Sequence, residues 1–140
     1  MNTINPYTSV IPTVGRVLLA TIFIFSGIGK LLAPAATIGY IASTGLPFAA
    51  LALAIAIGVE LGGGLLLALG IQTRLVAAAL AAFSIVTGLA FHNAVGDQNQ
   101  LIHLLKNIAM AGGLLQVVAF GAGAYSFDNR AAVKTGRQMA

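Results

Sequence analysis

Four long runs of apolar residues, separated by short polar or glycine-containing stretches, make up most of this chain. They cover residues 14–32, 48–69, 75–91 and 98–120. A helix of about 20 residues spans the roughly 30 Å hydrocarbon core of a bilayer. The pattern therefore predicts an all-α fold: four transmembrane helices in an antiparallel bundle, because short connections join consecutive helices.

The segments outside the four runs complete the predicted organisation. Residues 1–13 form a polar lead, residues 14–120 a single transmembrane domain, and residues 121–140 a polar tail. Between the first two spans, residues 35–44 have the composition of a short helix that lies in the membrane interface and ends at a glycine. Asp97 is placed to cap the N-terminus of the fourth span.

Composition agrees with a membrane protein and excludes several other classes. Of the 140 residues, 59% are hydrophobic and only 7% are charged, whereas soluble globular domains carry roughly 25% charged residues. The chain has no cysteine, which excludes disulfide exchange and thiolate metal sites. Its net charge of +4 is scattered along the sequence, so no nucleic-acid partner is predicted.

The basic residues predict the orientation in the membrane. With four crossings, one side of the bilayer holds both termini and five basic residues, namely Arg16, Arg74, Arg130, Lys134 and Arg137. Lys30 and Lys106 lie toward the other side. Because Lys and Arg are more frequent on the cytoplasmic side, both termini are predicted to be cytoplasmic. Arg16 and Arg74 are interpreted first as topology signals.

One carboxylate lies in the middle of the second run. Residues 58–64 read GVELGGG, which places Glu60 at the centre of an otherwise uncharged segment. A charge at that depth costs about 2.5–3.5 kcal/mol on insertion scales. Glu60 is therefore predicted to be paired or functional, and the glycines around it to permit close helix packing.

Lys106 and Asn107, in the fourth run, are the predicted partners of Glu60. If the Gly-Gly-Leu-Leu stretches of the second and fourth runs lie at equal depth, the two charges differ by about 4.5 Å along the membrane normal. Two interpretations remain open: a structural ion pair that fixes helix register, or a proton relay or polar anchor in which Asn107 binds a ligand carbonyl. Lys30 is either a residue that extends to the interface or a further site residue.

Three more polar residues are expected near the outer face: His92, Asp97 and His103. This outer-face cluster is interpreted as a place of proton exchange with solvent or as a simple polar interface. Only Asp97 and Glu60 are available to complete a ligand set with the two histidines, so neither a metal nor a haem site is predicted. The chain also lacks a Rossmann glycine pattern, a P-loop and an HExxH motif.

The order and spacing of these motifs resemble the DoxX family of small bacterial inner-membrane proteins. Five stretches carry the resemblance: residues 25–31 (FSGIGKL), 58–63 (GVELGG), 69–74 (LGIQTR), 105–114 (LKNIAMAGGL) and 121–128 (GAGAYSFD). The resemblance implies four helices in the inner membrane and an association with redox systems such as thiosulfate–quinone oxidoreductase and quinone-stress response. It also implies that Lys30, Glu60, Lys106 and Asn107 are the family's polar positions.

The resemblance and the residues together predict an accessory or quinone-interacting component of a membrane redox system. The expected ligand is a quinone, with no covalently bound cofactor. The expected partners are the lipid bilayer, subunits of a membrane oxidoreductase and further copies of the chain. Any catalytic role would be that of a subunit of a quinone-linked oxidoreductase. Two alternatives stay open: a structural or assembly protein without a ligand, and a carrier of protons or small solutes.

Overall fold

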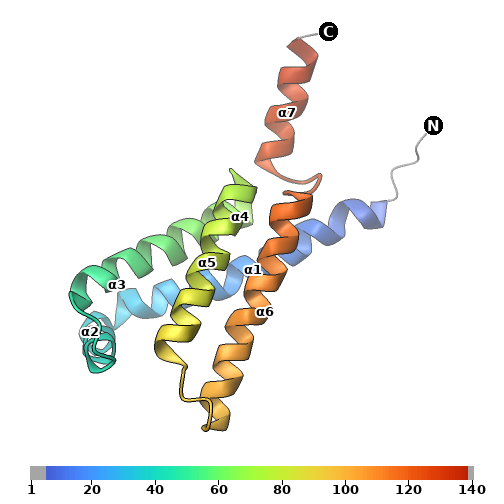
Figure 1. Cartoon of the computed structure of the whole chain (residues 1–140). Helices are drawn as coiled ribbons and strands as arrows, with labels where there is room; N and C mark the ends of the chain where they lie inside the picture. Colours follow the sequence, from blue (N-terminus) through green and yellow to red (C-terminus); the bar gives the residue numbers. More distant parts are fainter. Residues whose placement is uncertain (1–5, 139–140) are drawn as a thin grey trace.

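The computed structural model describes residues 6–138, all of whose regular structure is helical (Figure 1). Within that range four helical segments are long and apolar enough to cross a membrane, which confirms the predicted all-α membrane bundle. The elements are α1 (Pro6–Leu32), α2 (Pro34–Ser43), α3 (Ala49–Ile57), the π-helix η1 (Gly58–Gly63), α4 (Gly64–Leu69), α5 (Thr73–Phe91), α6 (Gln98–Phe120) and α7 (Phe127–Gln138).

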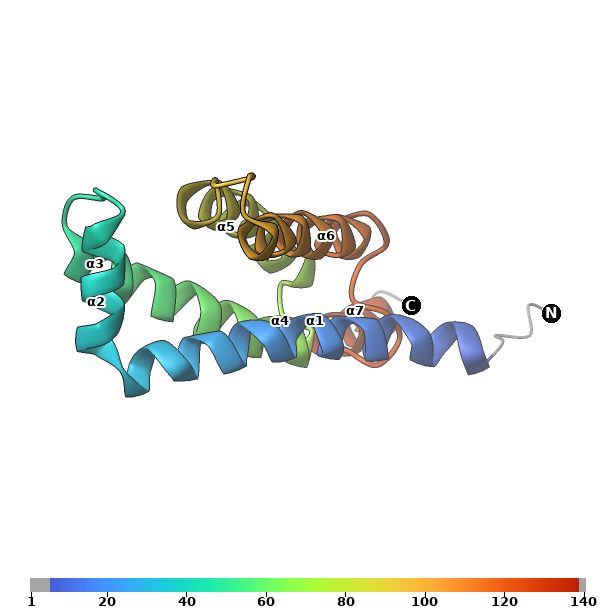
Figure 2. The same cartoon turned by 90° about the horizontal axis from the view of Figure 1, so that it is seen from below.

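The spans form two layers with a narrow apolar core between them. Figure 2 shows α1 beside the continuous rod α3–η1–α4, and the α5–α6 hairpin as the second layer. The core residues are Ala20, Phe23, Leu67, Ala77, Leu80, Ala81, Ala111 and Leu114. Large apolar side chains such as Phe25, which is 78% exposed, face outward. An apolar exterior of this kind is what a bilayer requires.

The first helix begins earlier than the sequence pattern predicts. Helix α1 starts at Pro6 and its membrane-span candidate at Val10, so part of the predicted lead is helical. Proline is well tolerated in a first helical turn, and Pro12 inside the helix removes one backbone hydrogen bond. A Cβ added to Gly123 would lie 3.0 Å from the Pro12 Cβ, so the chain after α6 packs against this extension. Residues 1–5 lie outside the described range.

The short helix after the first span is present as predicted. Helix α2 covers Pro34–Ser43 and is followed by Gly45, whose φ of +81° is a left-handed conformation that glycine adopts without strain. In Figure 2, α2 crosses the end of the first layer. Its location in the membrane interface stays a prediction.

The second span is a single rod interrupted by a π-helical turn, which the sequence pattern did not predict. It runs from α3 through η1 to α4, and η1 contains Glu60 at its third position. A π-helical turn has one more residue per hydrogen-bonded ring than an α-helix, and such turns are frequent at functional sites. Glu60 therefore lies in the turn of the rod that departs from α-helical winding.

Close contact between α1 and the rod depends on two glycines. A Cβ on Gly27 would lie 2.7 Å from the Leu61 Cγ, and one on Gly64 would lie 2.8 Å from the Ile24 Cγ1. By contrast, a Cβ on Gly58 or Gly62 would meet no described atom within 4 Å. The glycines around Glu60 were predicted to permit close packing, and within the described chain this holds for Gly63, which packs against Leu80, and for Gly64, but not for Gly58 and Gly62.

The α5–α6 hairpin matches the predicted third and fourth spans. Asp97 caps α6 as predicted, since its side chain accepts a hydrogen bond from the Gln100 backbone N–H at 2.9 Å. A Cβ on Gly88 of α5 would lie 2.9 Å from the Asn107 Cβ, so α5 and α6 approach closely at this level. Helix α6 makes most of its contacts with α5.

The predicted polar tail contains a helix, α7, fastened to the turn between α4 and α5. The Asp128 carboxylate accepts hydrogen bonds from the Gln72 and Thr73 backbone N–H groups, each at 2.8 Å, and from the Thr73 hydroxyl at 2.7 Å. The Asp128 N–H donates to the Gly70 carbonyl at 2.9 Å. Hydropathy could not reveal this helix, because tertiary hydrogen bonds and not apolar burial hold its first turn.

Candidate functional site

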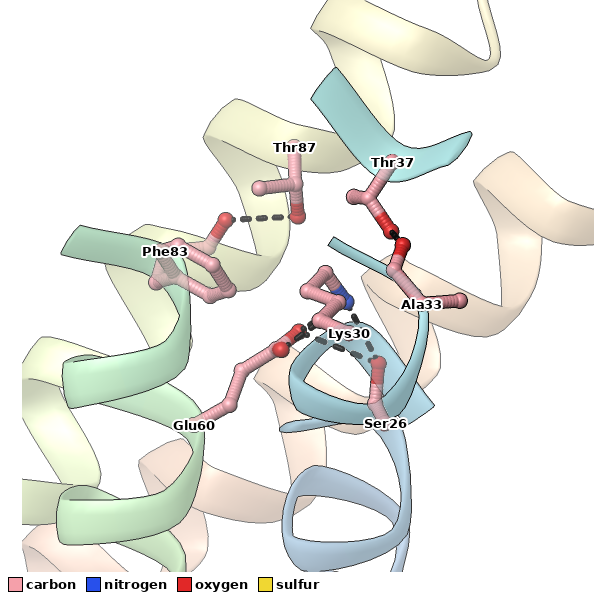
Figure 3. Close-up of polar contacts among 7 residues, drawn as sticks. All are labelled: Ser26, Lys30, Ala33, Thr37, Glu60, Phe83 and Thr87. Atoms are coloured by element: carbon pink, nitrogen blue, oxygen red, sulfur yellow. Dashed lines mark hydrogen bonds and ion pairs between the residues drawn. The ribbon is translucent and has the colours of Figure 1, made fainter. Parts of the chain in front are cut away.

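Glu60 forms an ion pair with Lys30 of α1. The Lys30 Nζ lies 2.8 Å from Glu60 Oε2 and 3.0 Å from Oε1 (Figure 3). The Ser26 hydroxyl joins both groups, because it donates to Glu60 Oε1 at 3.2 Å and accepts from Lys30 Nζ at 2.8 Å. The Glu60 side chain is 8% exposed and that of Lys30 is 26% exposed. The carboxylate is therefore buried, whereas the lysine is only half-buried.

The prediction that Lys106 forms the ion pair with Glu60 was wrong, and the helix packing explains why. Gly27 lets α1 approach the rod closely, and Ser26 and Lys30 lie four residues apart on one helical face. That face brings the ammonium to Glu60, whereas α6 packs mainly against α5. The sequence pattern gave Ser26 no separate role in the site; its i, i+4 spacing from Lys30 was the signal that could have identified one.

All four residues of the predicted ligand site nevertheless line one cavity. It has a volume of ≈ 500 Å³ and lies between α1, α2, the rod, α5 and α6. Lys30 and Glu60 border it from the first layer, and Lys106 and Asn107 border it from α6. Cavities of this volume are typical of small-molecule sites.

The remaining walls of this cavity are mostly apolar and aromatic. Four aromatic rings contribute, those of Phe23, Tyr40, Phe83 and Phe91. Tyr40 and Phe91 are stacked with their centroids 5.7 Å apart, which joins α2 to the end of α5. The Thr37 and Thr87 hydroxyls donate to the Ala33 and Phe83 carbonyls (Figure 3). Both hydroxyl oxygens keep acceptor capacity.

On α6, the polar groups of Lys106 and Asn107 are only partly engaged. Lys106 Nζ lies 3.1 Å from His103 Nδ1, and the Asn107 amide donates to the His103 carbonyl at 2.9 Å. An ammonium has three donors, and an amide has two donors and a carbonyl acceptor. Both residues therefore keep hydrogen-bonding capacity for a ligand.

The predicted outer-face cluster is formed by the two histidines but not by the acid. The His92 and His103 rings are stacked with centroids 4.9 Å apart, and His92 Nδ1 lies 2.9 Å from Gln100 Oε1. His92 also borders the cavity, whereas the Asp97 carboxylate caps α6. Within residues 6–138, no three His, Asp or Glu side chains are grouped to hold a metal ion.

Arg16 has a structural role that its interpretation as a topology signal missed. It is 2% exposed, and its guanidinium donates to the carbonyls of Ala122, Tyr125 and Ala68. These contacts tie α1 and α4 to the connection before α7. Gly70 makes room for them, since a Cβ there would collide with the guanidinium and with Ser126.

Comparisons with known proteins agree with this architecture. The sequence profile of a family described as DoxX matches residues 11–93. The chain is 36% identical over 115 residues to Inner membrane protein YqjF of Escherichia coli (strain K12), which covers 82% of this chain and 87% of that protein. It is 32% identical over 124 residues to Inner membrane protein YphA of the same organism, covering 84% and 87%. No solved structure matches.

Proposed function

This chain belongs to the DoxX family, and we propose that it is a quinone-binding accessory component of a membrane redox system. It is a multi-pass inner-membrane protein, as its four spans and its relatives' names indicate. The observation that carries the proposal is the cavity between the helices that is bordered by an ion pair on one side and by Lys106 and Asn107 on the other.

The cavity suits a ring that carries two carbonyl oxygens. Aromatic side chains on its walls can stack with a quinone ring. The Asn107 amide and the Lys106 ammonium can donate to one carbonyl, because neither has used all its donors. Glu60 can accept a proton, with Lys30 and Ser26 holding its carboxylate in place.

Binding of decylubiquinone to the full chain in lipid nanodiscs tests this proposal. Asn107→Leu is expected to weaken binding about tenfold, since one lost hydrogen bond is worth roughly 1–1.5 kcal/mol. Gln116→Leu is the matched control, because Gln116 lies exposed on the same helix and does not border the cavity. Absence of saturable binding, or an Asn107→Leu affinity equal to that of the wild type, would contradict the proposal.

Glu60 is tested separately by the Glu60→Gln variant, which keeps the shape of the side chain but not its charge. We expect it to bind quinone and to lose redox-linked proton uptake. If this variant supports the activity of the membrane redox system as well as the wild type does, Glu60 has no part in the mechanism.

A structural role is the second candidate, and the Lys30–Glu60–Ser26 contacts favour it. Lys30 and Ser26 both donate hydrogen bonds to Glu60 Oε1, and Lys30 also lies 2.8 Å from Oε2, an arrangement expected of a pair that fixes helix register. In this case the Lys30→Leu, Glu60→Leu double variant would keep all cellular function. Under the quinone proposal the same variant folds but loses function.

A further inference from the structure

The charged groups around the cavity do not balance. Glu60 is the only acidic residue that borders it, and Lys30 neutralises that carboxylate at 2.8 Å. The two other acids of the chain are engaged elsewhere: Asp97 caps α6, and Asp128 fastens α7. Within the described part of the chain, no carboxylate oxygen lies within 4.0 Å of Lys106. The cavity therefore has one ammonium without an acidic partner.

The group that does contact Lys106 leaves its charge in place. His103 Nδ1, 3.1 Å from Lys106 Nζ, can only accept from an ammonium, which puts the imidazole proton on Nε2. A neutral imidazole orients the ammonium and contributes no negative charge. One of the three N–H donors is used in this way, and the others remain.

The Lys106 side chain is exposed on α6, a membrane-span candidate, and nothing within the described part of the chain supplies the opposite charge. A charge on a membrane-spanning segment is costly unless it is paired. A ligand that carries an anionic oxygen on an apolar ring would offset it with a charge-assisted hydrogen bond, which is stronger than one to a neutral carbonyl. The aromatic rings of Phe23, Phe83 and Phe91 would contact the ring of the ligand.

We propose that the cavity selects quinones in an anionic form, such as a hydroxyl-substituted quinone ionised at that hydroxyl, with the charged oxygen held by Lys106. This inference rests on the proposed function and names the ligand class for the same site. Lys106 is the specificity-determining residue, and His103 positions it.

A matched pair of ligands tests the preference. In nanodiscs of zwitterionic phosphatidylcholine at neutral pH, 2-hydroxy-1,4-naphthoquinone is ionised and 1,4-naphthoquinone is neutral. We expect the anion to bind about tenfold or more tightly. Lys106→Gln should remove the preference and Lys106→Arg should keep it. The control Lys134→Gln, an exposed lysine on α7, should leave it unchanged.

The outcomes distinguish the anion preference from the proposed quinone binding on which it rests. Equal affinity for the two naphthoquinones overturns the anion preference, and a preference that survives Lys106→Gln overturns the role of Lys106; both results leave quinone binding intact. If the wild-type protein binds neither naphthoquinone and does not bind decylubiquinone, both proposals are overturned. Acidification that protonates the hydroxyl should reduce the preference in the wild type; a preference unaffected by acid would contradict the inference. Circular dichroism of each variant checks that the helices are retained.

Discussion

At the scale of single residues, the Lys30–Glu60 pair is the interaction on which the candidate site depends. Replacing Lys30 by Leu leaves a carboxylate that is 8% exposed without its cation, and should lower the free energy of unfolding by about 3–5 kcal/mol. Glu60→Leu should lower the free energy of unfolding by less, because the Lys30 side chain that it leaves unpaired is 26% exposed and can reach polar surroundings. Denaturant unfolding in detergent micelles measures both effects.

The double variant is the control for this interpretation. With both residues replaced by Leu, neither charge of this pair is left without the other, and stability should return to within about 1 kcal/mol of the wild type. Additive losses in the double variant would mean that the two side chains do not act as a pair.

What the sequence revealed at this scale depended on how local the interaction is. Asp97 was predicted as a cap because its carboxylate accepts from the backbone N–H of Gln100, only three residues later, so the sequence itself shows both partners. The partner of Glu60 was predicted wrongly because Lys30 and Lys106 are both plausible by depth. The choice between them depends on which helix approaches the rod. Close packing of Gly27 against Leu61 brings α1, and therefore Lys30, next to Glu60.

At the scale of helices, the glycines of the second span predict opposite effects of the same substitution. Gly64→Ala should destabilise the bundle by about 1–3 kcal/mol, because its Cβ would lie 3.2 Å from the Ile24 backbone nitrogen as well as against that side chain. Gly62→Ala should be neutral or stabilising by up to about 1 kcal/mol, since alanine favours the helix and the space is open. Thermal unfolding compares them, and equal losses would refute the packing described.

The attachment of α7 should depend on acid pH. Burial alone would raise the pKa of the Asp128 carboxyl, but hydrogen bonds from Thr73 and Gln72 and the charge of Arg16 together lower that pKa below its ordinary value. The ionised carboxylate therefore stabilises the contact above the ordinary pKa of aspartate, and this stability is lost as the pH falls through the lowered pKa. The protection of the Gln72 and Thr73 amides from hydrogen exchange should fall as the pH passes through the lowered pKa of Asp128.

The matched control for this pH dependence is Asp128→Asn. The amide keeps an oxygen acceptor but no charge, so exchange at Gln72 and Thr73 should be faster than in the wild type and should show no acid transition. An acid transition that persists in Asp128→Asn would assign the titration to a different group.

The helices themselves were largely predictable, whereas their winding and their attachments were not. Runs of apolar residues report lipid exposure, so the span from Gln98 to Phe120 was predicted at its observed bounds. Hydropathy does not distinguish α from π winding, which is why η1 was missed. Helix α7 was missed because its anchor is the turn that ends α4, more than fifty positions earlier in the sequence.

At the scale of the whole molecule, the distribution of basic residues predicts the orientation. The chain contains no cysteine, so a single cysteine can be introduced at Ala132 on α7 or at Val95 between α5 and α6. A membrane-impermeant thiol reagent added to intact cells should label the cysteine at position 95 and not the one at position 132. The reverse pattern would show that α7 lies outside the cytoplasm.

The central claim is that a quinone occupies the cavity between the two layers. Photolabelling of the full chain in nanodiscs with an azido-substituted ubiquinone, followed by peptide mapping, tests this claim most directly. We expect covalent label on cavity-lining segments of α2, α5 and α6, reduced by competition with unmodified quinone, and much less label in Asn107→Leu. Label spread over the lipid-facing surface and insensitive to competitor would contradict it.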